Sequence, residues 1–439
     1  MNKKTRIIYQ KLKNIFWHLP KNYLLALKYG FPAKKLTLIG ITGTDGKTTV
    51  CDLVYQTLSE AGFKVGMINT LGAKIGPNDL STKLHMTSPD PEIIQKILKM
   101  MVKKNITHAV LEVTAHALDQ YRYLGCQFLV SAITNTSHEH LDDFLDIKSY
   151  TIAKSKLFNF SKYSILNKDD QSYSIIKDST KSSITTYSIN NPSDYQAKNI
   201  TQDSKYLKFN VNDQLIVTDS NYYYQIYNIL VALAVIDKLK IDPQLFLKII
   251  KNFPEIRGRR QLVPNDLGIK TIVDFAHTPG ALEQTLTSLK RLTKGNLIVL
   301  FGATGGRDPS KRPFMGKASQ IANIAILTAD DTRNENVETI NQQIISGFDP
   351  NNSKYINHST LTTLKDYQNI NKLSKKSFIY FDIKNRQDAF NLAVKLAQKG
   401  DTIVACGKGH EMTILHGSTE YPWSETEAFR SAFKFKDVY

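Results

Sequence analysis

The stretch Leu36–Thr49 (LTLIGITGTDGKTT) decides the fold of this chain. It starts with a short apolar run, LTLIGI, which has the length and composition of a buried strand. It continues into TTVCDLVYQTLSEAG, which has the spacing of a helix that ends at Gly62. Between the two lies the glycine loop GTDGK at residues 43–47. A strand, a glycine loop and a helix in this order predict the first unit of a parallel α/β sheet.

The alternation of strands and helices continues downstream of this unit. KVGMINTL, HAVLEVT and LVSAITN are expected to be strands, with a helix at about 91–104. Short β segments are expected over 160–220, and a long helical pattern covers 225–250. The alternation restarts after FPEIRG (253–258), so we predict a central domain at 36–255 and a second α/β domain at 256–439.

Residues 1–35 form a short basic segment before the first strand. They hold nine Lys or Arg and no acid, whereas the whole chain has 57 basic and 40 acidic residues and a net charge of +17. Apolar residues between the lysines of residues 6–30 predict helices on both sides of Pro20. Such a helix either packs on the next domain with a lysine-rich outer face, or lies on a membrane or a phosphate group.

Composition narrows the class of protein. The three cysteines (Cys51, Cys126 and Cys406) show no C-x-x-C spacing, which argues against a zinc ribbon or a secreted disulfide framework. No apolar run approaches the roughly 20 residues that span a bilayer, and the N-terminus makes a poor signal peptide. We therefore expect a cytoplasmic protein of two or three domains with no transmembrane segment.

The loop after the first strand has the features of a phosphate site. Its glycines allow several backbone N–H groups to point at one anion, and the following helix presents its positive end to the same place. Lys47 adds a cation, and the hydroxyl of Thr48 can bind Mg²⁺. The strict pattern G-x-x-x-x-G-K-[ST] is not met, because Ile41 replaces its first glycine.

A series of motifs in a fixed order resembles the Mur ligase family, the amide-forming enzymes of peptidoglycan precursor synthesis. The resemblance covers residues 36 to about 430 and implies a P-loop central domain with a parallel sheet, followed by a second Rossmann-like α/β ligase domain. Within the family, the motifs resemble the branch that adds the third peptide residue. The motifs are GITGTDGKTT, TSPDP (87–91), EVTAHALDQYR (112–122), TNTSHEHLD (134–142), YTIAKSKLF (150–158), RGRRQLV (257–263), VDFAHTPGAL (273–282), FGATGGRDPSKRPFMG (301–316), DDTRNEN (330–336) and CGKGHE (406–411).

The resemblance implies ATP and Mg²⁺ as cofactors and an acyl phosphate as intermediate. Lys47 is expected to act on the phosphates, and the implied metal site consists of Thr48, Glu112, His140 and Lys154, the last as a CO₂-derived carbamate. By the same resemblance, the ATP-binding residues are Gly43, Thr44, Asp45, Gly46, Lys47, Thr48, Thr49, Asn228, Arg259, His277, Asp308, Lys311 and Arg312. The substrate-binding residues are Thr87, Ser88, Thr114, Gln120 and Arg122.

The implied substrates are UDP-MurNAc-dipeptide and a free diamino acid. Members that add diaminopimelate carry D-N-P-R. This chain reads DDTR at 330–333, so it keeps Arg333 but has Asp331 and Thr332 in place of Asn and Pro. Gly407 and Glu411 match the same pocket, with Glu411 placed to hold the distal ammonium group. We expect meso-diaminopimelate, with L-lysine as the alternative; if Asp331 neutralised Arg333, diaminopimelate would lose its partner.

The role of the N-terminal segment and two other functions stay open as alternatives. The family has an N-terminal domain of about a hundred residues that holds the UDP end of the substrate, a usual domain size. Here the basic segment 1–35 is expected to serve as a reduced substrate-binding region, and contact of this segment with a membrane stays open.

A folylpolyglutamate synthase-like ligase is the first alternative function, and a basic P-loop ATPase that binds nucleic acid is the second. We expect no nucleic-acid partner and a monomer.

Overall fold

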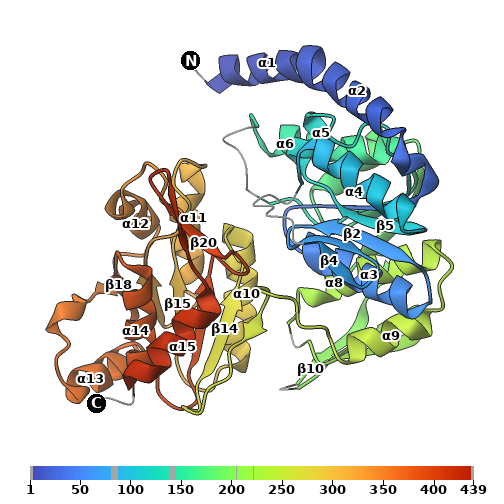
Figure 1. Cartoon of the computed structure of the whole chain (residues 1–439). Helices are drawn as coiled ribbons and strands as arrows, with labels where there is room; N and C mark the ends of the chain where they lie inside the picture. Colours follow the sequence, from blue (N-terminus) through green and yellow to red (C-terminus); the bar gives the residue numbers. More distant parts are fainter. Residues whose placement is uncertain (1–2, 81–87, 138–143, 204, 221, 437–439) are drawn as a thin grey trace. The chain divides into compact units, whose positions relative to one another are not determined.

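The computed structural model describes residues 3–80, 88–137, 144–203, 205–220 and 222–436. The chain divides into two compact units, Met1–Pro254 and Glu255–Tyr439. Each unit contains a mainly parallel sheet with helices on its faces, so the predicted α/β fold class is confirmed (Figure 1). In the ranges that the structure describes, no helix combines the length and the apolar character needed to cross a membrane.

The sheet of the first unit has the strand order β4-β3-β2-β5-β1-β6-β7-β8-β9. Pairing is parallel from β2 to β9, and β3 and β4 extend the sheet as an antiparallel hairpin. In the register of β1 and β5, Ile41 pairs with Glu112, which brings the ends of both strands to one edge. The strands are β1 (Thr37–Thr42), β2 (Val65–Asn69), β3 (Gly72–Ile75), β4 (Asn78–Leu80), β5 (His108–Glu112), β6 (Phe128–Ile133), β7 (Ser161–Asn167), β8 (Ser183–Ser188) and β9 (Tyr195–Gln196).

Helices cover both faces of this sheet because alternate strand residues point to opposite sides. Ile39 and Ile41 of β1 join one core with α3 (Lys47–Glu60), α8 (Gln225–Lys238) and α9 (Pro243–Lys251), whereas Leu38 joins the other core with α4 (Pro91–Lys103) and α5 (Ala115–Asp119). The other elements of the unit are α6 (Ile147–Ser155), α7 (Ser172–Ser179) and an antiparallel sheet of β10 (Lys198–Gln202), β11 (Leu207–Val211) and β12 (Gln214–Thr218).

The helical pattern of 225–250 forms two helices rather than one. Lys240 adopts a positive φ of 58°, which ends α8, and Pro243 starts α9 as its first residue. An isolated residue with positive φ cannot continue a right-handed helix, and proline is favoured at a helix start.

The basic N-terminal segment consists of two helices joined by a π-helical turn. They are α1 (Lys3–Lys13), the turn Asn14–His18 and α2 (Leu19–Tyr29). Asn14 Nδ2 donates to Asp119 Oδ2 at 2.6 Å, and Asn22 Nδ2 donates to the carbonyl of Gln120 at 2.8 Å. The segment therefore lies against α5 of the first unit, next to the predicted substrate residues.

The second unit has the strand order β13-β14-β19-β15-β16-β18-β17, with β13 antiparallel and the others parallel. Apart from Arg259, which precedes β13, the predicted residues of this unit follow the carboxyl ends of β14, β15, β16 and β19, where open parallel sheets bind ligands. Its strands are β13 (Gln261–Leu262), β14 (Lys270–Asp274), β15 (Leu297–Phe301), β16 (Ile324–Leu327), β17 (Ser353–Tyr355), β18 (Phe378–Asp382), β19 (Thr402–Cys406), β20 (Thr413–His416) and β21 (Thr419–Pro422). Its helices are α10 (Pro279–Leu292), α11 (Arg312–Ser319), α12 (Val337–Ile345), α13 (Leu364–Leu373), α14 (Arg386–Leu396) and α15 (Glu425–Lys436).

Candidate active site

The loop between β1 and α3 requires glycine at two positions. Gly43 and Gly46 have φ of 141° and 86°, values that L-residues rarely adopt. A Cβ atom on Gly43 would lie 1.8 Å from Thr134 Oγ1, and one on Gly46 would lie 2.3 Å from Asn228 Oδ1. Helix α3 starts at Lys47, so its first N–H groups face the end of the sheet without a side-chain cap.

The segment that follows β6 holds this loop from the side. Thr44 N donates to the carbonyl of Asn135 at 2.8 Å, and Asp45 N donates to Asn135 Oδ1 at 3.0 Å. Thr134 Oγ1 donates to the carbonyl of Asp45 at 2.6 Å. The sequence reasoning quoted the motif TNTSHEHLD without assigning a role to Thr134 or Asn135. Their position directly after the strand beside β1 was the signal for a role in holding the loop.

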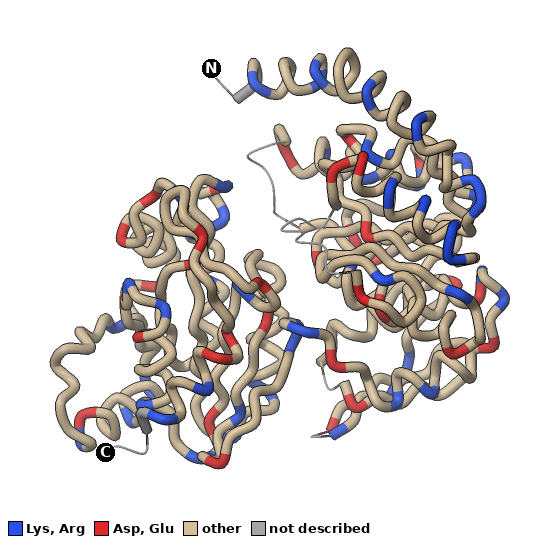
Figure 2. The backbone as a smooth tube through the Cα atoms, in the orientation of Figure 1, with Lys and Arg blue, Asp and Glu red and all other residues tan. Residues whose placement is uncertain are grey.

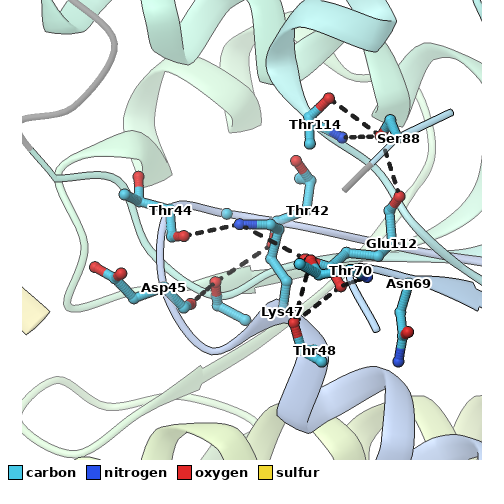
Figure 3. A network of polar contacts seen from close by, with 12 residues as sticks. Thr42, Thr44, Asp45, Lys47, Thr48, Asn69, Thr70, Ser88, Glu112 and Thr114 are labelled. Atoms are coloured by element: carbon cyan, nitrogen blue, oxygen red, sulfur yellow. Dashed lines mark hydrogen bonds and ion pairs between the residues drawn. The ribbon is translucent and has the colours of Figure 1, made fainter. Parts of the chain in front are cut away.

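Glu112 is the centre of a polar network at the end of β5 (Figure 3). Thr48 Oγ1 donates to Glu112 Oε2 at 3.0 Å, and Lys47 Nζ lies 3.9 Å from Oε1. Thr70, which the sequence reasoning missed, donates to both carboxylate oxygens, from its N at 3.0 Å and from its hydroxyl at 2.9 Å. Lys47 Nζ also donates to the carbonyl of Thr44 at 2.8 Å.

The oxygen atoms of Thr48 and Glu112 suit Mg²⁺, a hard cation that takes only one or two protein ligands beside phosphates and water. Within the described ranges no cluster of three His, Cys, Asp or Glu side chains could hold a metal by itself. A nucleotide phosphate would have to complete such a site. His140, the other predicted histidine ligand, lies outside the described residues.

Lys154 is buried beside the phosphate loop rather than on a solvated helix face. Its side chain is 1% exposed, and Nζ donates to the carbonyl of Gly43 at 2.7 Å. Nζ also lies 4.2 Å from the centre of the Tyr150 ring. Its amine therefore lies at the loop between β1 and α3.

Four of the five predicted substrate residues lie together between α4 and α5. Ser88 Oγ accepts from Thr114 N at 3.2 Å and from Thr114 Oγ1 at 3.1 Å. Arg122 donates to Gln120 Oε1 at 2.8 Å and to the carbonyl of Ser88 at 2.7 Å, and burial lowers its pKa. Thr87 lies outside the described residues.

A cleft of about 240 Å³ opens between this cluster and the N-terminal helices. Burial lowers the pKa of His18 in the cleft, and the charges of Lys13, Lys21 and Arg122 lower it further. Basic groups from two parts of the chain therefore face one space, alongside two acids. The cleft is lined by His18, Lys21, Asn22, Leu25, Asp90, Pro91, Glu92, Gln120 and Arg122.

The predicted ATP residues of the second unit have two different environments. Lys311 Nζ donates to the carbonyl of His277 at 2.9 Å, so these two lie together, and the Arg259 guanidinium stacks 4.2 Å above the Phe275 ring. Arg312 is instead buried, with an ion pair to Glu335 at 2.7 Å and a further bond to Gln343 at 2.6 Å. Asp308 caps the turn at Pro309–Lys311, where it accepts from Ser310 N at 2.9 Å.

Asn228, assigned to ATP from the first unit, lies against the phosphate loop. Its Nδ2 donates to Gln225 Oε1 at 2.8 Å, and its Oδ1 faces the Cα of Gly46. The remaining loop residues, Thr44, Asp45 and Thr49, follow β1 or belong to the first turn of α3.

Lys408 organises the predicted amino-acid pocket, and the sequence reasoning missed it. Its Nζ pairs with Asp331 Oδ1 at 2.7 Å and with Glu411 Oε2 at 2.6 Å. Asp331 therefore pairs with Lys408, and among the ion pairs of the described residues none joins it to Arg333. Lys408 belongs to the motif GKGHE. The signal in the sequence was a basic residue in the same pair of motifs as the acids Asp331 and Glu411.

Charges and burial set the protonation of this pocket. Burial raises the pKa of Glu411, against the opposing charge of Lys408. Burial also disfavours the ionised form of Asp330, but the charges of Lys408 and Arg386 hold the pKa of Asp330 below its usual value. Gly407 is required here, because a Cβ atom would lie 2.6 Å from Asp330 Oδ2.

Arg386 fixes the strand ends that carry the pocket. Its Nε pairs with Glu425 Oε1 at 2.7 Å, and both side chains are buried. Its other nitrogens donate to the carbonyl of Ala329 at 2.8 Å, just after β16, and to that of Cys406 at 3.0 Å, at the end of β19. Arg386 therefore holds together the points at which the segments 330–333 and 407–411 leave the sheet.

Comparisons with known proteins agree with this arrangement. The models of the Mur ligase middle domain and of the Mur ligase glutamate ligase domain match residues 41–236 and 258–409. A UDP-N-acetylmuramoyl-L-alanyl-D-glutamate–2,6-diaminopimelate ligase from Oceanobacillus iheyensis is 31% identical over 428 residues, which cover 94% of this chain and 81% of that protein. A solved structure of an enzyme with the same name has a TM-score of 0.60 at 28% identity and covers 93% of this chain and 80% of its own.

A structure of FolC from E. coli shares the fold alone, with a TM-score of 0.64 at 16% identity over 89% of this chain and 91% of its own. The two family matches take in most of this chain, with one domain model on each compact unit. The chain belongs to the Mur ligase family of ATP-dependent ligases.

Proposed function

We propose that this enzyme joins meso-diaminopimelate to UDP-N-acetylmuramoyl-L-alanyl-D-glutamate, with ATP cleaved to ADP and phosphate. The observation that carries this choice is Arg333, which follows β16 two residues after Asp331; among the ion pairs of the described residues, none joins it to Asp331 or Glu411. Two similar proteins, each matched over more than 90% of this chain, are named as ligases of the same two substrates, and this supports the proposal. We place the reaction in the cytoplasm, where ATP and nucleotide-linked precursors are available.

The reaction has two steps because a carboxylate is a poor electrophile. The substrate carboxylate first attacks the γ-phosphorus of ATP, which forms an acyl phosphate and releases ADP. The amine of the incoming amino acid then attacks the acyl carbon, and inorganic phosphate leaves with the bonding electrons. Both steps place negative charge on phosphate oxygens, so positioning and charge neutralisation provide the catalysis.

The phosphate loop supplies these two functions in the first unit. The N–H groups at the start of α3 bind the phosphates, and Lys47 neutralises charge on them. Thr48 and Glu112 would hold Mg²⁺, which when bound polarises the phosphoryl oxygens. Thr70 donates two hydrogen bonds to Glu112 and so fixes its carboxylate toward Thr48.

Lys154 in this proposal carries a carbamate formed from its amine and CO₂. Lys154 is buried at the phosphate loop, where its Nζ donates to the carbonyl of Gly43 and faces the Tyr150 ring. Carbamylation replaces the cation by an anionic oxygen group beside the loop. We expect Lys154→Ala to lose turnover and external acetate to restore part of it, whereas Lys162→Ala, at an exposed position, keeps full activity. Normal activity of Lys154→Ala without acetate would contradict the carbamate.

The N-terminal segment contributes to substrate binding through the cleft beside Arg122 and Gln120. Lys21 and His18 add basic groups there, which suits the diphosphate of a nucleotide-linked substrate. We expect Lys21→Gln to raise KM for the UDP-linked substrate and to leave KM for ATP unchanged. A variant with unchanged KM for both substrates would remove the segment from the binding site.

Phosphate release from ATP tests the proposal directly. The purified enzyme is mixed with UDP-MurNAc-dipeptide and, separately, with meso-diaminopimelate, L-lysine or L-ornithine. We expect release with diaminopimelate, its loss in Lys47→Met, and no change in the matched variant Lys74→Met on β3. Release only with L-lysine would mean that lysine is the amino-acid substrate, while the proposed reaction would stand. Release with none of the three amino acids would reject the assignment.

The same assay separates the alternatives. A folylpolyglutamate synthase-like enzyme would release phosphate with a folate and glutamate instead. A nucleic-acid-dependent ATPase would release it with DNA or RNA alone and lose this activity steeply as salt rises. The family membership favours neither of these results.

A further inference from the structure

The N-terminal helices carry an unusual concentration of exposed apolar side chains. Nine of the 23 large apolar side chains that are exposed in the described ranges fall between residues 8 and 27, with exposed fractions from 47% to 75%. Single exposed apolar residues are normal on a soluble surface, but a contiguous group of this size marks an interaction site. The nine are Ile8, Tyr9, Leu12, Ile15, Phe16, Trp17, Tyr23, Leu24 and Leu27.

Apolar side chains of α1 and of the turn that follows it form one exposed face opposite the buried side of the helix. Ile8, Leu12 and Ile15 follow the spacing i, i+4 and i+7 of a single helix stripe, and Phe16 extends it. Ile7 and Asn14 define the opposite side, since both are buried and Asn14 bonds to Asp119. The helix is thus held to the first unit by its polar contacts, while its apolar stripe stays uncovered.

Basic residues border this apolar stripe. Arg6 and Lys13, seven residues apart, lie along one edge of it, and Lys11 lies on the other, given 100° of rotation per residue. The segment 1–35 holds nine Lys or Arg and no Asp or Glu. Figure 2 shows the same pattern, with basic positions and no acidic ones along the N-terminal helices.

We propose that the outer face of residues 6–27 binds the surface of an anionic lipid bilayer. An apolar stripe rich in Phe, Trp, Tyr and Leu with basic edges is typical of a helix that lies in the plane of the interface. Its apolar side chains enter the acyl boundary, and its cations face the lipid phosphates. Binding is peripheral, since no described helix can span a membrane. This inference is independent of the ligase reaction, which uses the opposite side of α2 and the sheet edge.

Charge complementarity favours a lipid surface over a protein partner. Each Lys or Arg near an anionic membrane strengthens binding about fivefold, so a segment without any acid gains from each of its basic residues. A typical protein interface has fewer lysines at its core and contains charges of both signs.

Vesicle binding of the full-length enzyme tests the proposal. We expect it to float with vesicles that contain about 30% phosphatidylglycerol, to bind vesicles of pure phosphatidylcholine at least about tenfold more weakly, and to dissociate as salt shortens the range of charge attraction. The chain has two tryptophans, Trp17 and Trp423. Trp17 is 62% exposed, so its emission should shift to the blue on binding.

Matched variants locate the contact. The double variant Leu12→Glu and Phe16→Glu puts two carboxylates into the stripe and should abolish flotation and the blue shift. Leu364→Glu changes a side chain of similar exposure, 68%, at the start of α13 in the second unit and should bind like the wild type. Phosphate release with soluble substrates should stay unchanged in both, which shows that they are folded.

Several results would overturn the inference. These are no binding to either kind of vesicle, equal binding to neutral and anionic vesicles, or equal loss of binding in Leu364→Glu. Sedimentation that shows a dimer broken by Leu12→Glu and Phe16→Glu, without vesicle binding, would assign the stripe to a second copy of the chain. A failure of the ligase assay would leave these vesicle results unaffected.

Discussion

Replacement of Arg333 by alanine should change which amino acid the enzyme prefers. Arg333 is held by its backbone, which accepts from Gly417 N at 2.7 Å and pairs with His416 at the end of β20, and it has a positive φ of 50°. Its buried Nε has no hydrogen-bond partner among the described residues, and Asp331 is paired with Lys408 instead. We therefore propose that the guanidinium donates hydrogen bonds to a carboxylate of the substrate.

The size of the effect follows from the contacts that alanine removes. A hydrogen bond to a charged group contributes about 1.5–3 kcal/mol, and a guanidinium can make two to one carboxylate. Because Arg333 is half-buried rather than fully buried, we take about 3 kcal/mol for the pair, which corresponds to about 150-fold in kcat/KM. L-Lysine lacks the distal carboxylate, so its kcat/KM should change by less than about threefold.

Phosphate release at varied amino-acid concentration measures both ratios. Arg333→Lys keeps the charge but loses the fork, so we expect an intermediate loss with diaminopimelate. Arg291→Ala, at an exposed arginine near the end of α10, is the control and should behave like the wild type. An equal loss with diaminopimelate and lysine would refute the role of Arg333 in selecting the distal carboxylate, and so would an unchanged rate with diaminopimelate.

Three further predictions follow from the geometry of the two units. Glu112→Gln keeps a similar shape but removes the charge, so kcat should fall at least about a hundredfold and the Mg²⁺ requirement should rise in a titration of the metal. Gly46→Ala pushes a Cβ against Asn228, so calorimetry should show ATP binding at least about tenfold weaker, whereas Gly62→Ala, also at positive φ but in open space, should bind ATP normally. Burial and nearby arginines lower the pKa of His410 to about 3, so the unfolded chain takes up a proton below pH 6.5 that the folded state refuses. Urea unfolding without ligands should therefore lose about 2 kcal/mol from pH 7 to pH 5 through this residue, and His410→Gln should remove that part of the loss.

The fold could be predicted from the sequence because its signals are local. The apolar run before Gly43 and the helical spacing after Lys47 each depend on neighbours along the chain, and the structure places β1 and α3 there. The break between α8 and α9 was missed because the apolar pattern continues through it. A positive φ at Lys240 is a property of the packed turn, which periodicity does not report.

The candidate site was predicted less completely, because many of its contacts join distant segments. Motif matching found Glu112 but not Thr70, whose two hydrogen bonds to it cross 42 positions. It assigned Arg312 to ATP, which stays a prediction, and it did not anticipate the ion pair of Arg312 with Glu335, 23 positions away. A basic residue in a motif contacts either a ligand or a buried acid, and only the tertiary structure shows which one lies nearby.

The charges of the amino-acid pocket support a substrate with two ammonium and two carboxylate groups. Asp330, Asp331 and Glu411 surround one cation, Lys408, so this part of the pocket has surplus negative charge and attracts ammonium groups. Arg386 also acts on Asp330, but Glu425 forms an ion pair with Arg386 and adds a further negative charge, so the surplus remains. Arg333 lies outside the ion pairs of Lys408 among the described residues, and we propose that it supplies the positive group for the distal carboxylate. Lysine would use the negative part and leave Arg333 without a carboxylate, whereas diaminopimelate uses both.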